Sequence, residues 1–368
     1  MPIAEFALER YFAKWEFAAR YVLGASDLEP YRLDELIALA DDDARRRWET
    51  LTLGYTESLG LPALRDEIAT LYERVAADDV ITFAGAEEGI FIAMHALLQS
   101  GDHAVVVWPS YQSLHEVARA VGAAVTLIPL DPSDWSLDVD AVATAIRPNT
   151  RVIVANSPHS PTGAQLAPDQ LARLVAIAEQ HGVHFFSDEV YRLLEHEGPP
   201  LSAAADCSDR AISLGVMSKA FGLAGLRIGW IATRDRSLFA RLASLKDYTS
   251  LCNSAPSEIL ALMALRAKDL VLERSRAIIS RNLALLDQFF ARNDARFDWI
   301  RPRAGSVCFP KLLGGDVDEF AAELVEREGV LVVPASQFGY PGNYFRLGYG
   351  RCNMGEALSR LETFANAF

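Results

Sequence analysis

The sequence predicts an α/β protein: a large domain with a mostly parallel central sheet between helices, and a smaller α+β domain. Short apolar runs alternate with helical segments from about residue 80 to 230, a pattern typical of a parallel sheet. Glycine, proline and polar turns follow these runs. With 368 residues, the chain is longer than a domain with a single hydrophobic core usually is, which suggests two domains. We expect the large domain to span 45–245, and the smaller one 1–44 with 246–368.

Composition and charge narrow the classes of function. The 35 basic and 49 acidic side chains give a net charge of -14, which argues against a nucleic-acid partner. The four cysteines lie far apart without metal-ligand spacing, so we expect no metal site, no disulfide framework and a cytoplasmic location. No apolar run is long enough to cross a membrane, and the N-terminus does not resemble a signal peptide.

The first segments carry aromatic and acidic side chains at nearly helical spacing. We expect a helix over residues 5–22, a loop at Gly24, a second helix near Leu33 and a third that begins at Pro62. The loop before Pro62 carries Tyr55, which taken alone is more often a packing residue. Acidic residues that could meet a cationic substrate group, or simply face solvent, are Glu16, Asp27 and Glu29.

Five predicted strands of the large domain end at residues suited to ligand binding. The strands lie at about residues 80–83, 104–108, 151–155, 183–186 and 211–216, with a further strand at 125–130. In a parallel sheet their ends lie along one edge, where ligands bind. These ends carry Gly85, Tyr111, the proline-rich loop Asn156–Gly163, Asp188 and Lys219.

Three of these positions suggest chemistry. Lys219 has small or apolar neighbours, so its amine would be partly desolvated and could form a Schiff base, although a lone lysine usually lies at the surface. Asp188 ends a buried strand, where a carboxylate is costly unless it meets a cation. The helix that starts at Ala86 and Glu87 offers free N–H groups to an anion, and Arg227 lies among glycines that allow close approach to a phosphate.

The remainder of the chain is expected to form the smaller domain. Helices are expected over 237–248 and 256–291, short strands at 307–311 and 331–333, then the strand YFRLGYG and a final helix. That last strand carries Arg346, which could bind a carboxylate or form a surface salt bridge of little energetic value.

Six motifs occur in one order: YTESLGLPALR, GDHAVVVWPSY, PHSPTG, SDEVY, MSKAFGLAGLRIGW and FRLG. On these motifs the sequence closely resembles the fold-type I pyridoxal phosphate (PLP) enzymes, specifically the class I/II aminotransferases, from about Leu51 to Arg346. The resemblance implies the PLP-dependent transferase type I fold, PLP as cofactor, and amino-group transfer between an L-amino acid and a 2-oxo acid. It also implies a homodimer with shared active sites.

The resemblance assigns roles to individual residues. Lys219 would be the Schiff-base lysine and proton carrier, Asp188 would pair with the pyridine nitrogen, and Tyr191 would bond the 3′ oxygen. Arg346 would grip the substrate carboxylate, with Ala25 and Ser160 beside it. The remaining cofactor contacts would come from Gly85, Ala86, Glu87, Tyr111, Asn156, Ser160, Ser218 and Arg227, and from Tyr55 in the neighbouring subunit.

Two positions depart from the family pattern. Ser160 replaces the usual asparagine before Pro-Thr-Gly, and Val216 replaces a phosphate-binding serine. These changes leave elimination or cyclisation open beside transamination, and the acids Glu16, Asp27 and Glu29 would suit a basic substrate. A non-catalytic binding protein that retained the fold is the alternative from another class. No motif names the amino acid or the oxo acid.

Overall fold

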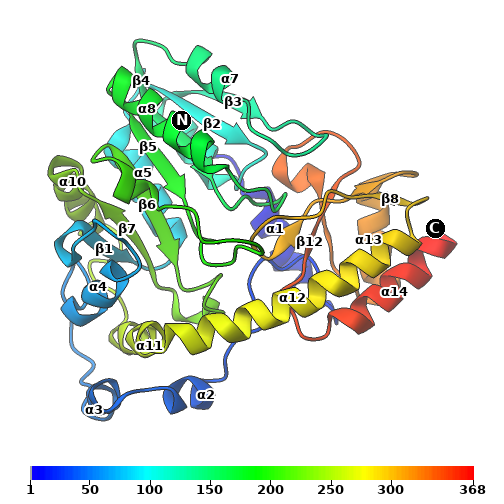
Figure 1. Ribbon diagram of the computed structural model, residues 1–368, viewed down its shortest axis with the longest axis horizontal. Coiled ribbons are helices and arrows are strands. Elements are labelled where there is room, and N and C mark those ends of the chain that lie inside the picture. The colour runs from blue at the N-terminus through cyan, green and yellow to red at the C-terminus, as the bar shows by residue number, and fades with distance from the viewer. Residues whose placement is uncertain (1) are drawn as a thin grey trace.

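A seven-stranded sheet forms the centre of the computed structural model, which describes residues 2–368 (Figure 1). The strand order is β1-β7-β6-β5-β4-β2-β3. Only β7 runs antiparallel to its neighbours in this sheet, so β1, β2, β4, β5 and β6 all point the same way. The α/β fold class is therefore confirmed, and the five predicted strand ends share one edge. The strands are β1 (Val80–Phe83), β2 (His103–Trp108), β3 (Ala124–Pro129), β4 (Thr150–Asn156), β5 (His184–Asp188), β6 (Ala211–Val216) and β7 (Gly229–Thr233).

Helices cover both faces of this sheet because its strands are apolar on both sides. In β4, Val152 and Val154 pack into one core, whereas Ile153 and Ala155 pack into the other. The first core includes α5, α6 and α10, and the second includes α7 and α8. These helices are α5 (Ala86–Leu97), α6 (Ser113–Val121), α7 (Val139–Thr144), α8 (Pro168–His181) and α10 (Arg236–Lys246), with the short α9 (Ala204–Cys207).

A second group of elements follows the sheet in the chain. The long helix α12 runs from α11, beside the sheet, to the right-hand group in Figure 1 that contains α13, α14, β8 and β12. Two small antiparallel sheets form there, with strand orders β10-β8 and β11-β12-β9. The elements are α11 (Ala255–Arg266), α12 (Lys268–Arg292), α13 (Val317–Glu328), α14 (Met354–Ala367), β8 (Phe297–Asp298), β9 (Val307–Cys308), β10 (Lys311–Leu312), β11 (Val333–Pro334) and β12 (Phe345–Gly348).

The N-terminal helix α1 contacts both groups of elements. The Tyr11 hydroxyl donates to the Val332 carbonyl at 2.9 Å, and the Ala7 amide donates to the Gln112 side chain at 3.0 Å. Segment 7–15 is thereby fixed over the edge of the large sheet where the strand ends lie. The N-terminal helices are α1 (Ala7–Trp15), α2 (Leu33–Ala38), α3 (Asp42–Glu49) and α4 (Pro62–Ala69), and short 3-10 helices occur at η1 (Ala77–Asp79), η2 (Ala224–Leu226) and η3 (Ala335–Phe338).

Two sequence expectations were wrong in detail. The first helix ends at Trp15 rather than near residue 22, because Tyr21 must pair with Val330 in a β-bridge. The helical stretch expected over 256–291 is present as two helices that meet at Ala267. The glycine-rich segment after Arg227 contains β7, a strand that the sequence pattern did not predict. No helix in residues 2–368 has both the length and the apolar composition needed to cross a membrane.

Candidate active site

Lys219 lies three residues beyond β6, at the shared edge of the strand ends. Its amine donates to the Ser26 hydroxyl at 2.7 Å and lies 5.6 Å from the centre of the Tyr191 ring. The side chain is half-buried rather than at the open surface. The structure therefore places this amine inside a site built from the sheet edge and the N-terminal loop.

Asp188 ends the adjacent strand β5 and is only 4% exposed. Its Oδ1 accepts a hydrogen bond from the Val190 amide at 3.2 Å. Burial raises the pKa of this carboxyl to about 7, and the nearby charge of Lys219 opposes only part of that rise. The expectation that Asp188 pairs with a cation is not met by the described residues, which form no ion pair with it. This buried carboxyl is left available to a positively charged ligand atom.

The loop after β4 is held in place by Asn156. Its Nδ2 donates to the Asp188 carbonyl at 2.8 Å, and its Oδ1 accepts from the Ser160 amide at 2.6 Å. Asn156 and Ser160 are both buried at the strand ends. Within the chain, Asn156 thus fixes the spacing of two strand ends, which is a positioning function that sequence reasoning did not assign.

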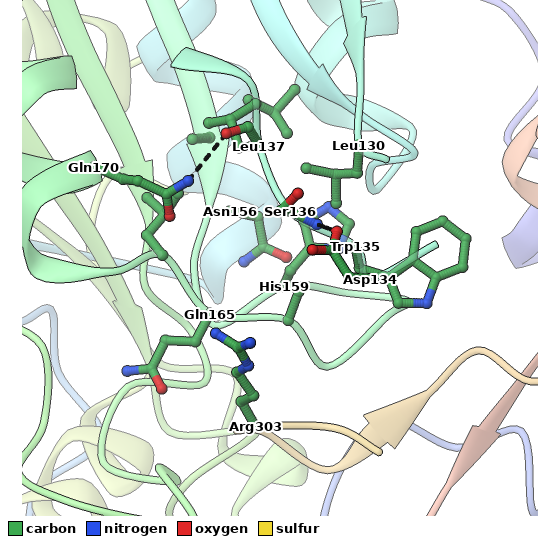
Figure 2. A pocket seen from close by; sticks show the side chains of 14 residues that line it. Leu130, Asp134, Trp135, Ser136, Leu137, Asn156, His159, Gln165, Gln170 and Arg303 are labelled. Carbon is green, nitrogen blue, oxygen red and sulfur yellow. Dashed lines mark hydrogen bonds between the residues drawn. The ribbon is translucent and has the colours of Figure 1, made fainter. Parts of the chain in front are cut away.

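Figure 2 shows a small cavity behind this loop, lined by Asn156, His159, Trp135 and Arg303 among others. Its volume is about 50 Å³, which suits a few water molecules at most. Burial lowers the pKa of His159 to about 4, so its imidazole is neutral at pH 7. Neither Lys219 nor Arg346 lines this cavity, and we therefore separate it from the substrate site.

The start of α5 forms a cradle beside Arg227. Gly85 has a φ of 94°, and a Cβ at this position would lie 2.4 Å from Nη2 of Arg227. A Cβ on Gly229 would likewise lie 2.7 Å from the Ala86 amide nitrogen. Because neither position has a Cβ, the Arg227 guanidinium and the free N–H groups at the start of α5 can lie close together. These donors are suited to bind a phosphate.

Two side chains beside this cradle affect its charge. Glu87 accepts a hydrogen bond from the Ser113 hydroxyl at 3.0 Å. Burial raises the pKa of Glu87 to about 7. Near pH 7, about half of the Glu87 side chains are therefore protonated, and a protonated carboxyl does not repel a bound phosphate as a carboxylate would. Ser218 is 7% exposed and precedes Lys219 directly.

Arg346 of β12 is 2% exposed and has no carboxylate partner in residues 2–368. Its Nε and Nη2 donate to the Gly24 carbonyl at 3.1 and 2.8 Å. The rings of Phe12 and Phe338 lie 5.6 and 5.4 Å from the guanidinium carbon. Ala25, 5% exposed, follows Gly24 directly. A buried guanidinium without an ion pair is a strong candidate to bind a ligand carboxylate.

Tyr111 lies under α1 at the end of β2. Its hydroxyl donates to Glu9 Oε1 at 2.9 Å, and its ring centre lies 5.0 Å from that of Phe6. Burial raises the pKa of the phenol well above its ordinary value, so the hydroxyl remains protonated. Helix α1 therefore forms one wall of the site.

Tyr55 is not brought to the site within its own chain. It lies on the loop between α3 and α4 and is 90% exposed. The other predicted site residues gather at and just after the strand ends, in the loop Asn156–Gly163, on β12, or, for Ala25, in the loop after α1. Sequence reasoning missed the contacts of Glu9, Phe12, Ser26 and Phe338, because none of the six motifs contains these residues. The amphipathic spacing of the first helix was a signal for Glu9 and Phe12 alone.

Comparisons with known proteins identify one family for most of the chain. Residues 31–361 match the family described as aminotransferase class I and II. Capreomycidine synthase from Streptomyces vinaceus is 31% identical over 353 residues, which cover 95% of this chain and 88% of that protein. An arginine–pyruvate transaminase from Pseudomonas aeruginosa is 31% identical over 309 residues, covering 80% of this chain and 77% of that protein.

Solved structures show the same fold over the whole chain. A PLP-dependent aminotransferase from Streptococcus suis is 30% identical and has a TM-score of 0.92, with 100% of this chain and 98% of that chain covered. A PLP-dependent cyclase, OrfR, is 28% identical with a TM-score of 0.91, and the coverage is 100% and 98%.

Proposed function

Because the chain belongs to the aminotransferase class I and II family, whose cofactor is PLP, we propose that it is an aminotransferase acting on an L-amino acid and a 2-oxo acid. The observation that carries this proposal is the placement of Lys219 beside Asp188 on neighbouring strand ends. An amine and a buried carboxyl at this edge supply a nucleophile and a partner for a protonated ring nitrogen.

The residues present fit the cofactor. Asp188 is a buried carboxyl without an ion pair in the described chain, which a pyridinium nitrogen would provide. Gly85 and Gly229 leave room where Arg227 and the Ala86 amide converge, which suits a phosphate. When bound, PLP supplies an electron sink for the charge that develops at the substrate Cα.

We assign the moving proton to Lys219. Its amine lies between the Ser26 hydroxyl and the Tyr191 ring, so it is held without a competing carboxylate in direct contact. From this position it would first hold the cofactor and then carry the proton at Cα. Tyr191 would donate its hydroxyl to the 3′ oxygen, and Tyr111 would stack on the ring.

Arg346 would orient the amino acid. Two of its donors are engaged by the Gly24 carbonyl, which fixes the plane of the guanidinium and leaves Nη1 and further N–H groups for a carboxylate. Ala25 and Ser160 would border that carboxylate. The α-carboxylate would thus be anchored on β12 while Cα faces Lys219.

A half-reaction experiment tests this proposal. Holoenzyme is mixed with each common amino acid in the absence of an oxo acid, and the absorbance of the cofactor is followed with the 2-oxo acid product measured by mass spectrometry. A transaminase converts its cofactor to the amino form and releases one oxo acid per site. If no amino acid yields an oxo acid, the proposal is wrong.

A second candidate is elimination or cyclisation of an amino acid. Specific observations favour it: the similarity to capreomycidine synthase covers 95% of the chain, and OrfR shares the fold at 28% identity. Ser160 also stands where aminotransferases usually have asparagine. In the same experiment, an elimination would regenerate the starting cofactor spectrum and release ammonia with its product, whereas a cyclisation would regenerate that spectrum and yield a cyclised amino acid.

We further propose a homodimer with shared sites. Tyr55 is 90% exposed, and Leu53 and Tyr248 are 85% and 89% exposed, so a second copy would cover these side chains. The loop that carries Tyr55 is firmly anchored: Lys246 Nζ donates to the Ser58 carbonyl, and the Leu61 amide donates to Glu258 at 3.2 Å. Sedimentation equilibrium tests this, because a monomer at micromolar concentration would contradict it.

The division into domains stays a proposal as well. Residues 45–245 would form the large cofactor-binding domain, and 1–44 with 246–368 the smaller one. In support, all seven strands of the large sheet lie within 80–233, whereas the small sheets lie within 297–348. Limited proteolysis of the apoprotein, with cleavage expected near residue 245, would test this boundary.

A further inference from the structure

We propose that the substrate is an L-amino acid whose side chain ends in a cation, a guanidinium or an ammonium, and that Glu16 binds this cation. The inference rests on the proposed function, because it assumes that Lys219 and Arg346 hold the amino acid. It adds the substrate class and one residue that determines specificity. Its basis is the set of charged groups that face the site from α1 and from the loop after it.

Glu16 lies on the face of α1 that borders the site. Glu9, Phe12 and Glu16 occur at the spacing i, i+3 and i+7, and Glu16 retains helical dihedral angles at the C-cap. Glu9 accepts the Tyr111 hydroxyl, and Phe12 lies 5.6 Å from the guanidinium carbon of Arg346. The same stripe therefore carries Glu16 past the carboxylate anchor, on the wall that the substrate side chain would meet.

Among the acids singled out by the sequence, Glu16 alone has a free carboxylate in the described chain. Asp27 forms an ion pair with Arg351, with N–O distances of 2.8 and 3.0 Å. Glu29 accepts the Cys352 amide at 2.8 Å. Within residues 2–368, no hydrogen bond or ion pair engages the side chain of Glu16, although this side chain is half-buried.

The charges around Glu16 favour a cation there. Burial raises the pKa of Glu16, and the carboxylates of Asp27 and Glu9 raise it further, whereas Arg351 and Lys219 lower it. A half-buried carboxylate among like charges is stabilised when a cation binds beside it. Arg351 is already paired with Asp27, and Lys219 is hydrogen-bonded to Ser26. The missing partner is therefore expected from the substrate.

Matched pairs of amino acids test the inference. Citrulline has the shape of arginine without the charge, and norleucine has nearly the length of lysine without the ammonium. The dissociation constant of each is obtained from the concentration dependence of the half-reaction, followed by the absorbance of the bound cofactor, for wild type, Glu16→Gln, Glu16→Asp and Glu326→Gln. Glu326 is an exposed acid on α13 and serves as the control.

We expect wild type to bind arginine or lysine about 10- to 100-fold more tightly than its neutral counterpart, the range of one charged hydrogen bond. Glu16→Gln should remove most of this preference while changing the affinity for the neutral partner less than about twofold, as expected when no charged hydrogen bond is lost. Glu16→Asp should keep part of the preference, and Glu326→Gln all of it.

Two results would overturn the inference: equal binding of the charged and neutral partners by wild type, or an equal loss of both in Glu16→Gln. The second result would indicate a structural role for Glu16. Failure of the proposed function is recognised separately, because then no amino acid, charged or neutral, would convert the cofactor to its amino form with release of one oxo acid per site.

Discussion

The two walls of the active site differ in how the chain builds them. The wall at the sheet edge carries the buried Asp188 and the half-buried Lys219, and both follow directly from strand ends. The opposite wall is α1 and the loop Gly24–Asp27, which carries Glu9 and Glu16 on partly exposed positions. Local sequence motifs place the residues of the first wall, whereas contacts between residues far apart in the sequence place those of the second.

This difference separates chemistry from specificity. The sheet edge places an amine and an acid where neighbouring strands set their spacing, which is a rigid arrangement suited to proton transfer. The helical wall is held by fewer contacts, such as the bond from Tyr11 to Val332, and can change its side chains without disturbing the sheet. Substitutions in the first wall should therefore affect turnover most, and those in the second should affect the choice of substrate.

The largest effect is expected for Lys219→Ala. Removal of the amine should lower turnover by about 10³-fold or more, if this residue carries the proton at Cα as proposed, and should abolish the visible absorbance of the attached cofactor. The measurement is steady-state turnover with an absorbance spectrum, and Lys268→Ala on α12 is the control. Retention of both activity and absorbance would show that Lys219 belongs to neither step.

Asp188→Asn should lower turnover and also make the stability of the apoprotein less dependent on pH. Turnover should fall by about 10²-fold or more, because the amide is a poorer partner for a protonated ring. The wild-type pKa is raised to about 7 from an ordinary value of 3.8, so its contribution to stability is full below pH 4 and is lost as the pH rises through 7.

The apoprotein of Asp188→Asn should therefore lose less stability than wild type between pH 4 and pH 8, by about 1 to 4 kcal/mol. Urea unfolding at the two pH values measures this difference. Glu87, whose pKa is also raised to about 7 and whose charge raises the pKa of Asp188, is present in both proteins. An identical pH dependence in both proteins would contradict the assigned burial effect.

Arg346→Lys is expected to act mainly on binding. The KM for the amino acid should rise about 10- to 100-fold with a smaller change in kcat, because a lysine cannot reproduce the two-pronged contact. Arg360→Lys, at a surface pair with Glu328, is the matched control. An unchanged KM would mean that the α-carboxylate binds elsewhere.

The smallest effect is expected for Tyr55→Phe. If Tyr55 reaches the phosphate site of a neighbouring subunit as proposed, loss of its hydroxyl should weaken PLP binding about 2- to 10-fold, the range of a single neutral hydrogen bond. Equilibrium dialysis of the cofactor measures it, with Tyr344→Phe as the control. If the affinity is unchanged while the protein is dimeric, Tyr55 lies outside the shared site.

Much of the sheet-edge wall was predictable because its signals are local. The strands β2 and β6 are continuous apolar runs, and turns follow them at fixed points, so the sequence pattern alone is enough to place Tyr111 and Lys219 at strand ends. The strand β7 was missed because it begins with a glycine, a residue that usually weakens a strand. Only the close approach of Gly229 to the Ala86 amide explains that glycine.

The sequence by itself determined the α/β class, the order of the strands along the chain and the residues at their ends, because periodicity and turn chemistry act over a few residues. Only the tertiary structure decided which charges are paired. Within residues 2–368 it joins Arg351 to Asp27, places Arg346 on the Gly24 carbonyl across 322 residues, and leaves Glu16 free. Such pairings depend on how distant segments pack, and no local pattern records them.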